Sequence, residues 1–159
     1  DSPIISGTIR GNVVGTAAGS VGGVCDVITY GTVYAGGNLT AGKVYYLAED
    51  PSISGAPSWK ETDATQGNTS VGLLAVALGT SPSNGMLLRG AVVIDYHVFA
   101  NTTPGRTLFL KTSGGGIQIT APASTNNIQR ILGHYIQTMS TTNHSLIYFN
   151  PSQEFITVA

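Results

Sequence analysis

The chain has 159 residues, with seven Lys plus Arg, eight Asp plus Glu and a formal net charge of −1 at pH 7. Charged residues make up 9% of it, whereas about 25% is typical of globular proteins. This composition excludes the basic face that nucleic-acid binding requires and gives no attraction to anionic membranes. Because enzymes gather ionisable groups in a cleft, an enzyme is the least expected class. A β-rich module that presents or binds a surface is favoured.

Short apolar runs separated by Gly, Pro, Asn and Ser recur along the chain and predict many short strands. Gly, Pro or β-branched residues interrupt every window long enough for a helix. We therefore expect an all-β fold: a compact β-barrel or sandwich of short antiparallel strands with an extended N-terminal arm. Residues 1–24 form the predicted Gly-rich arm and 25–159 a single β domain. Its expected strands are Val27–Tyr34, Lys43–Ala48, Val71–Leu78, Met86–Asp95, Thr107–Lys111, Gly116–Thr120, Arg130–Gln137, Ser145–Phe149 and Glu154–Val158.

Two connections carry specific expectations. Residues 49–70 are predicted to form a long, exposed loop that carries Trp59, with one short strand at most, around Ser58–Lys60. Asn84 and Gly85 lie between two apolar runs, and both residue types tolerate a positive φ. They predict a two-residue hairpin turn.

Side-chain alternation assigns faces within two of the strands. Tyr45 and Tyr46 point to opposite faces, so at most one of them is expected in the core. In Leu74–Leu78, the large residues face one way and Ala75 and Ala77 the other. Two alanines on one face permit close approach by a second sheet or a second subunit.

An internal repeat supports an arrangement in two pseudo-repeated halves. The segment Asn38–Leu47 matches Asn101–Leu110 at the Asn, Thr, Gly, basic and final aromatic–Leu positions. The halves cover about 38–95 and 101–150. Chance similarity between two Gly-rich segments is the alternative explanation.

The N-terminal arm has two interpretations. It begins with an apolar, extended stretch and continues through Gly, Ala and Val, a composition that buries little surface on its own core. One interpretation is an arm that adds to the sheet edge of a partner, where backbone hydrogen bonds give affinity. The other is a first strand with a flexible lead.

Motifs for catalysis and for cofactor or metal binding are missing from the sequence. Gly42-Lys43 is followed by Val44 rather than by the hydroxyl residue of a P-loop. The histidines lack metal-site spacing, and the carboxylates flanking the 49–70 loop lack the EF-hand pattern. Asp95 and His97 share a strand face and are interpreted as a surface pair. We expect no catalytic, cofactor-binding or metal-binding residues and no cofactor.

Trp59 raises a different possibility, because a loop Trp and a strand Tyr can stack on a sugar ring. The alternative, and the favoured one, is that Trp59 folds down to cap the barrel.

Part of the sequence resembles a β module of tailed-bacteriophage virion proteins. The resemblance lies in Ala41–Leu47, Val71–Gly79 and Asn84–Val92, and it continues through Gly105–Leu110 to Ile147–Pro151. The order G-K-V-Y-Y-L, loop, G-L-L-A-V-A, hairpin, L-L-R-G is its recognisable part. The module occurs in capsid decoration (cement) proteins and in terminal domains of fibres. Its motifs are structural, so they transfer no active-site residues.

The resemblance implies a structural protein on the outer surface of the virion. A cement protein clamps neighbouring subunits of the major capsid protein and thereby stabilises the icosahedral shell. Such proteins are commonly homotrimers with an extended N-terminal arm. The arm residues expected among the shell contacts are Pro3, Ile4, Ile5 and Ile9.

A rival function follows from the same resemblance. The domain can be the tip of a phage head or tail fibre that recognises host glycans through Trp59 and neighbouring Tyr residues. A fibre domain is expected to follow a long shaft, whereas the predicted β domain starts at residue 25 of this sequence. The sequence therefore favours capsid decoration.

Overall fold

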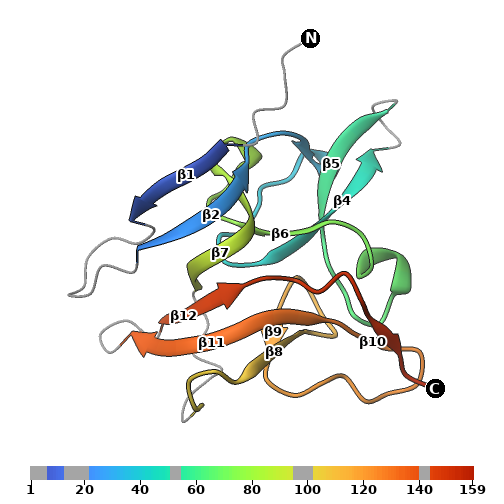
Figure 1. Cartoon of the computed structure of the whole chain (residues 1–159). Helices are drawn as coiled ribbons and strands as arrows, with labels where there is room; N and C mark the ends of the chain where they lie inside the picture. The colour runs from blue at the N-terminus through green and yellow to red at the C-terminus, as the bar shows by residue number, and fades with distance from the viewer. Residues whose placement is uncertain (1–6, 13–21, 51–54, 95–101, 140–143) are drawn as a thin grey trace.

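The computed structural model describes residues 7–12, 22–50, 55–94, 102–139 and 144–159 (Figure 1). Within these residues the chain forms strands and three short 3-10 turns, η1 (Tyr34–Gly36), η2 (Gly67–Thr69) and η3 (Pro82–Asn84), and no α-helix. The predicted all-β class is confirmed. The strands are β1 (Gly7–Asn12), β2 (Gly22–Ile28), β3 (Thr32–Val33), β4 (Val44–Asp50), β5 (Ala56–Glu61), β6 (Leu74–Ala77), β7 (Met86–Ile94), β8 (Thr107–Leu110), β9 (Ile117–Gln118), β10 (Ile128–Gln129), β11 (Ile131–Met139), β12 (His144–Phe149) and β13 (Ile156–Thr157).

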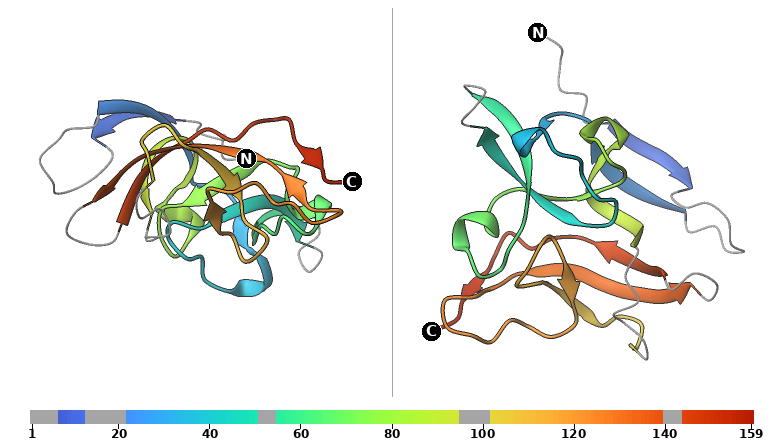
Figure 2. Two further views of the ribbon diagram at one scale, coloured as in Figure 1. Left: turned by 90° about the horizontal axis from the view of Figure 1, so that it is seen from below. Right: turned by 180° about the vertical axis from the view of Figure 1, so that it is seen from behind.

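Eleven of these strands make one sheet, in the order β3-β5-β4-β6-β7-β12-β11-β8-β9, with β2 paired to β7 and β1 to β2. All pairings are antiparallel except β3 with β5, which is parallel. Strands β10 and β13 form a second, two-stranded sheet. Figures 1 and 2 show β1–β7 and β8–β12 as two layers that meet where β7 lies beside β12.

The two halves have the same internal pairing. The order β5-β4-β6-β7 is mirrored by β9-β8-β11-β12, and the repeated Gly positions make equivalent contacts. The backbone N–H of Gly42 donates to Ala77 O at 2.8 Å, and that of Gly105 donates to Tyr135 O at 2.8 Å. The return bonds match as well, from Ala77 N to Lys43 O (3.0 Å) and from Tyr135 N to Arg106 O (2.9 Å). The sequence similarity thus coincides with a similarity of backbone hydrogen bonding.

The main core lies between the two layers. Its buried side chains come from β2, β4, β6 and β7 on one side and from β8, β9, β11 and β12 on the other. The free ends of the layers also meet through backbone bonds, since Val44 N donates to Gly115 O and Gly115 N donates to Thr62 O, both at 2.8 Å. The sheet therefore curls back on itself in the manner of a barrel. Burying each large apolar side chain contributes about 1.5–3 kcal/mol.

A second core on the outer face of the β4–β6–β7 layer was not expected from the sequence. Tyr45, Ala75 and Ala77 lie there with Trp59, Met86 and Leu39. The expectation that only one of Tyr45 and Tyr46 is buried is wrong, because Tyr46 belongs to the main core and Tyr45 to the second. The alanine face is covered by the chain's own residues, including Leu39.

Two predicted elements differ from the observed ones. The strand expected over Val27–Tyr34 is divided into β2 and β3, because Gly31 takes a φ of +102° between them. The connection over 49–70 contains β5, a strand of six residues that pairs along β4 from Ala56 to Glu61 and is longer than the short strand allowed around Ser58–Lys60. Hydrogen bonding to β4 thus makes this segment a strand despite its Pro and Ser residues.

The hairpin between β6 and β7 is present, but its turn is not the predicted one. Of the two turn residues, only Gly85 has a positive φ, at +108°. Asn84 ends η3, and its side-chain oxygen accepts the N–H of Ser81 at 3.1 Å. The bond between Ser81 and Asn84 holds this segment in a 3-10 turn. The chain then reverses its direction at Gly85.

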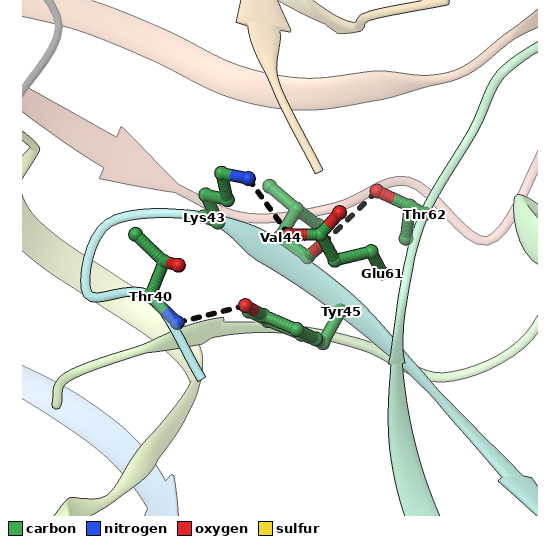
Figure 3. A network of polar contacts seen from close by, with 6 residues as sticks. All are labelled: Thr40, Lys43, Val44, Tyr45, Glu61 and Thr62. Atoms are coloured by element: carbon green, nitrogen blue, oxygen red, sulfur yellow. Dashed lines mark hydrogen bonds and ion pairs between the residues drawn. The ribbon is translucent and has the colours of Figure 1, made fainter. Parts of the chain in front are cut away.

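A small polar network fixes the start of β4 (Figure 3). Tyr45 accepts the backbone N–H of Thr40 on its hydroxyl oxygen at 2.8 Å. Thr62 donates its hydroxyl to Val44 O at 3.1 Å, and Lys43 Nζ lies 2.7 Å from Glu61 Oε1. These bonds join the 40–45 turn to the end of β5.

Replacing Tyr45 with phenylalanine is expected to lower the free energy of unfolding by about 1 kcal/mol. The ring still fills the second core, but the Thr40 N–H loses its acceptor. Urea unfolding of the two proteins measures the difference. Tyr148, which is exposed on β12, is the matched control, and Tyr148→Phe should change stability by less than about 0.5 kcal/mol. Equal effects of the two changes would contradict a role for the Thr40 bond.

Candidate functional site

The predicted partner-binding residues lie at the N-terminus. Pro3, Ile4 and Ile5 are outside the described residues. Ile9 lies on β1, opposite Cys25 on β2 in an antiparallel register. The predicted boundary at residue 24 therefore falls inside β2.

The β1–β2 pair is attached to the body of the protein through β7. Asp26, Val27 and Ile28 of β2 pair with β7, and Asp26 Oδ2 lies 3.0 Å from Arg89 Nη2 across that junction. Among the described strands, β1 pairs with β2 alone. Its other backbone edge is therefore open to a strand from outside the described part of the chain, and such edges are sites of strand addition.

Trp59 is not the exposed loop residue that the sequence suggested. It lies on β5, its side chain is 0% exposed, and its Nε1–H donates to Tyr30 O at 2.8 Å. The face of a buried indole cannot stack on a sugar. The favoured alternative, in which Trp59 folds down to cap the barrel, is right about burial, but the side chain lies in the second core rather than over the main core.

Two of the carboxylates considered for metal binding make ordinary contacts. Glu61 pairs with Lys43, and Asp63 Oδ1 accepts both the N–H and the hydroxyl of Thr65, at 2.9 and 2.7 Å. Asp95 and His97 lie outside the described residues. In the described part of the chain, no three His, Cys, Asp or Glu side chains gather in a way that could hold a metal ion.

An apolar hollow of about 480 Å³ lies beside the small sheet. Three exposed large apolar side chains line it: Ile156 on β13 (64% exposed), Phe155 (43%) and Ile131 on β11 (41%). The internal repeat allows this surface to be compared with the equivalent positions in the first half of the chain. Phe109 pairs with Ile131 as Tyr46 pairs with Leu74, yet Tyr46 and Leu74 are buried between the layers. The second half thus leaves uncovered a position that the first half buries.

Two further hollows are uncharged. One of about 520 Å³ is lined mainly by Thr, Ser, Asn and Gln between 112 and 127. The other, of about 430 Å³, lies between β3 and the start of β5, with Tyr30 at its edge. Tyr30 is 49% exposed. Sequence reasoning missed this position, because it placed Tyr30 inside a continuous strand.

Arg130 is a buried cation with no carboxylate partner among the described residues. Its Nη1 donates to Ser70 O and Gly72 O at 2.7 Å each, and its Nε donates to Ser152 O at 2.9 Å. Burial lowers the pKa of Arg130 to about 10, so the side chain remains charged at neutral pH. Its three carbonyl partners lie on two separate segments, which assigns it a structural role.

Comparison with protein-family models, with curated proteins and with solved structures found no match. No helix in the described part of the chain is long and apolar enough to cross a membrane.

Proposed function

We propose that this protein is a structural component of a tailed-phage virion that binds the outer surface of the capsid and stabilises it. The observation that carries the proposal is the N-terminal strand pair. Within the described residues β1 has one unpaired backbone edge, and the residues just before it in the sequence are the apolar Ser2–Ser6 stretch. An open edge that follows an apolar lead suits docking on a partner's sheet.

The character of the surface also supports the proposal. Charged residues are few, and several of those described are paired or buried, as in Lys43–Glu61, Asp26–Arg89 and Arg130. An exposed apolar patch such as that around Ile131, Phe155 and Ile156 is typical of proteins that bury surface in an assembly. The resemblance of residues 41–95 to the phage β module supports two proposed partners: the major capsid protein and further copies of this chain, with a trimer favoured.

The proposed mechanism is linkage rather than catalysis. A protein that binds the assembled shell and not its separated subunits stabilises the shell by mass action. Contacts to several neighbouring subunits at once raise the effective affinity without any new type of contact. No reacting group is needed.

Co-sedimentation with mature phage shells that lack this protein tests the proposal, with host cells as a parallel sample. We expect saturable binding to shells, at a stoichiometry that matches one set of symmetry sites. Binding to cells but not to shells would instead favour the receptor-binding function of a fibre domain.

Deletion of residues 1–6 should weaken shell binding by at least about tenfold, because burial of one Ile contributes about 1.5–3 kcal/mol. The deletion leaves β1 in place, so thermal unfolding should change little. The Ile4→Ser/Ile5→Ser variant keeps the length of the segment and should show the same loss. Full retention of shell binding by both variants would exclude the arm as a contact.

A further inference from the structure

Tyr30 is the most exposed aromatic residue in the described part of the chain. It lines the hollow between β3 and β5, which we call the Tyr30 hollow, and which holds about 430 Å³. None of the described lining residues carries a charge, and those other than Tyr30 are small or hydroxyl-bearing: Thr29, Gly31, Thr32, Gly55, Ala56 and Pro57.

The backbone beneath Tyr30 is fixed to the core. The indole N–H of the fully buried Trp59 donates to Tyr30 O at 2.8 Å. Two residues later, Thr32 pairs with Ser58, and its hydroxyl donates to Pro57 O at 3.4 Å. A ring carried on such a segment loses little conformational freedom when it binds a ligand, which favours affinity.

Gly31 lets this arrangement form. Its φ is +102°, and a Cβ at this position would lie 2.9 Å from Trp59 Nε1. Any side chain here would push the segment away from the indole. The tight turn between β2 and β3 therefore brings Tyr30 O onto Trp59 and leaves the Tyr30 side chain half exposed at the rim.

The chemistry of the hollow selects one class of ligand. An exposed aromatic ring offers an apolar face that packs on the C–H groups of a sugar ring. The neighbouring Thr29 and Thr32 are exposed. The hydroxyl of Thr32 donates to Pro57 O and can still accept a hydrogen bond from a sugar, and that of Thr29 can donate and accept. None of the described lining residues is charged, so this lining offers no charged group to recognise a phosphate, a carboxylate or a cation. We infer that the Tyr30 hollow binds a neutral pyranose sugar.

Of the proposed capsid contacts, only Ile9 on β1 is among the described residues, and it does not line the Tyr30 hollow. The inference also moves glycan recognition from Trp59 to Tyr30. Trp59 then acts as a positioning residue, since it holds the Tyr30 backbone. Sugar binding and shell binding have separate readouts.

The chain contains a single Trp, so a ¹H–¹⁵N spectrum holds one indole signal, and that N–H is bonded to Tyr30 O. The full chain is titrated with the methyl glycosides of glucose, galactose, mannose and N-acetylglucosamine. We expect at least one of them to shift the Trp59 indole signal saturably, with a Kd on the order of 1 mM, an affinity suited to one small ring. A shallow hollow with one aromatic residue does not predict tighter binding.

Two substitutions make the test specific. Tyr30→Ala should weaken binding by about tenfold, whereas Tyr30→Phe should retain most of it, because the ring face supplies the contact. Tyr148 is 39% exposed on β12, and Tyr148→Ala is the matched control that should bind as the parent does. The remaining amide signals report whether each variant is folded.

Three outcomes would overturn the inference. The first is that none of the four glycosides gives a saturable shift. The second is a shift that survives Tyr30→Ala in a folded protein. The third is a response to a proline-rich peptide but to no sugar, which would make the hollow a peptide site, since proline rings also stack on aromatic side chains.

Discussion

Replacement of Arg130 with alanine should lower the free energy of unfolding by about 3 kcal/mol, because three buried or part-buried carbonyls lose their donor at a cost of about 1 kcal/mol or more each. Those carbonyls belong to Ser70, Gly72 and Ser152. Arg130 thus joins the segment before β6 to the segment after β12. Urea unfolding followed by circular dichroism measures the change.

Burial of the Arg130 charge lowers the stability of the folded protein, whereas its three hydrogen bonds raise it. The pKa of Arg130 in the folded protein, about 10, lies well below its ordinary value. The unfolded state therefore binds the proton more tightly, so carrying the charge costs stability at neutral pH. This cost diminishes only as the pH rises above about 10. Between pH 6 and 9 the effect of Arg130→Ala should not change with pH.

Arg130→Met separates the hydrogen bonds from packing, because it refills most of the volume without a donor or a charge. We expect it to remain destabilised by about 2 kcal/mol, since the carbonyls stay unpaired. The exposed Arg106 is the control, and Arg106→Ala should change stability by less than about 0.5 kcal/mol. A Met variant as stable as the parent would show that the desolvation cost cancels the three bonds.

The second large effect is expected at Gly133, where an alanine should cost about 3 kcal/mol or more, since a strained backbone alone costs about 1–3 kcal/mol. Gly133 has a φ of +134° at an irregularity in the pairing of β11 with β8. A Cβ there would overlap the carbonyl oxygen of Tyr148 on the paired strand β12 and lie 3.0 Å from Asn150 N. The substitution would force apart two strands near the middle of the second layer.

Gly36 is the matched control for Gly133. Its φ is +66°, and a Cβ there meets nothing within 4 Å. Gly36→Ala should therefore lower the free energy of unfolding only by the cost of a left-handed conformation, about 1–2 kcal/mol. The difference between the two variants in chemical denaturation measures the steric overlap with β12. Equal losses would mean that β11 and β12 adjust to accept the side chain.

Several features of this protein were decided by the sequence alone. Short apolar runs between Gly, Pro and Asn allow strands and exclude helices, because no window sustains a helical period. Most strand positions followed from this pattern, as for Met86–Ile94 and Thr107–Leu110. The match of Asn38–Leu47 with Asn101–Leu110 predicted two similar halves, because the same turn and strand residues favour the same local geometry.

Tertiary structure decided which of these elements meet, and therefore what is buried. Pairing with β4 makes the Pro- and Ser-containing segment Ala56–Glu61 a strand, and it carries Trp59 into a second core. The Ser81–Asn84 bond replaces the expected two-residue turn.

Some of the candidate sites could be predicted from the sequence, and others depend on the tertiary structure. The apolar N-terminal residues Pro3, Ile4 and Ile5 are visible in the sequence because their composition is local. The Tyr30 hollow and the Arg130 contacts are not, because each joins residues distant in the chain: Tyr30 meets Trp59, and Arg130 meets Ser70. Local propensity follows from neighbouring residues, whereas exposure and hydrogen-bond partners depend on long-range packing, which only the folded chain determines.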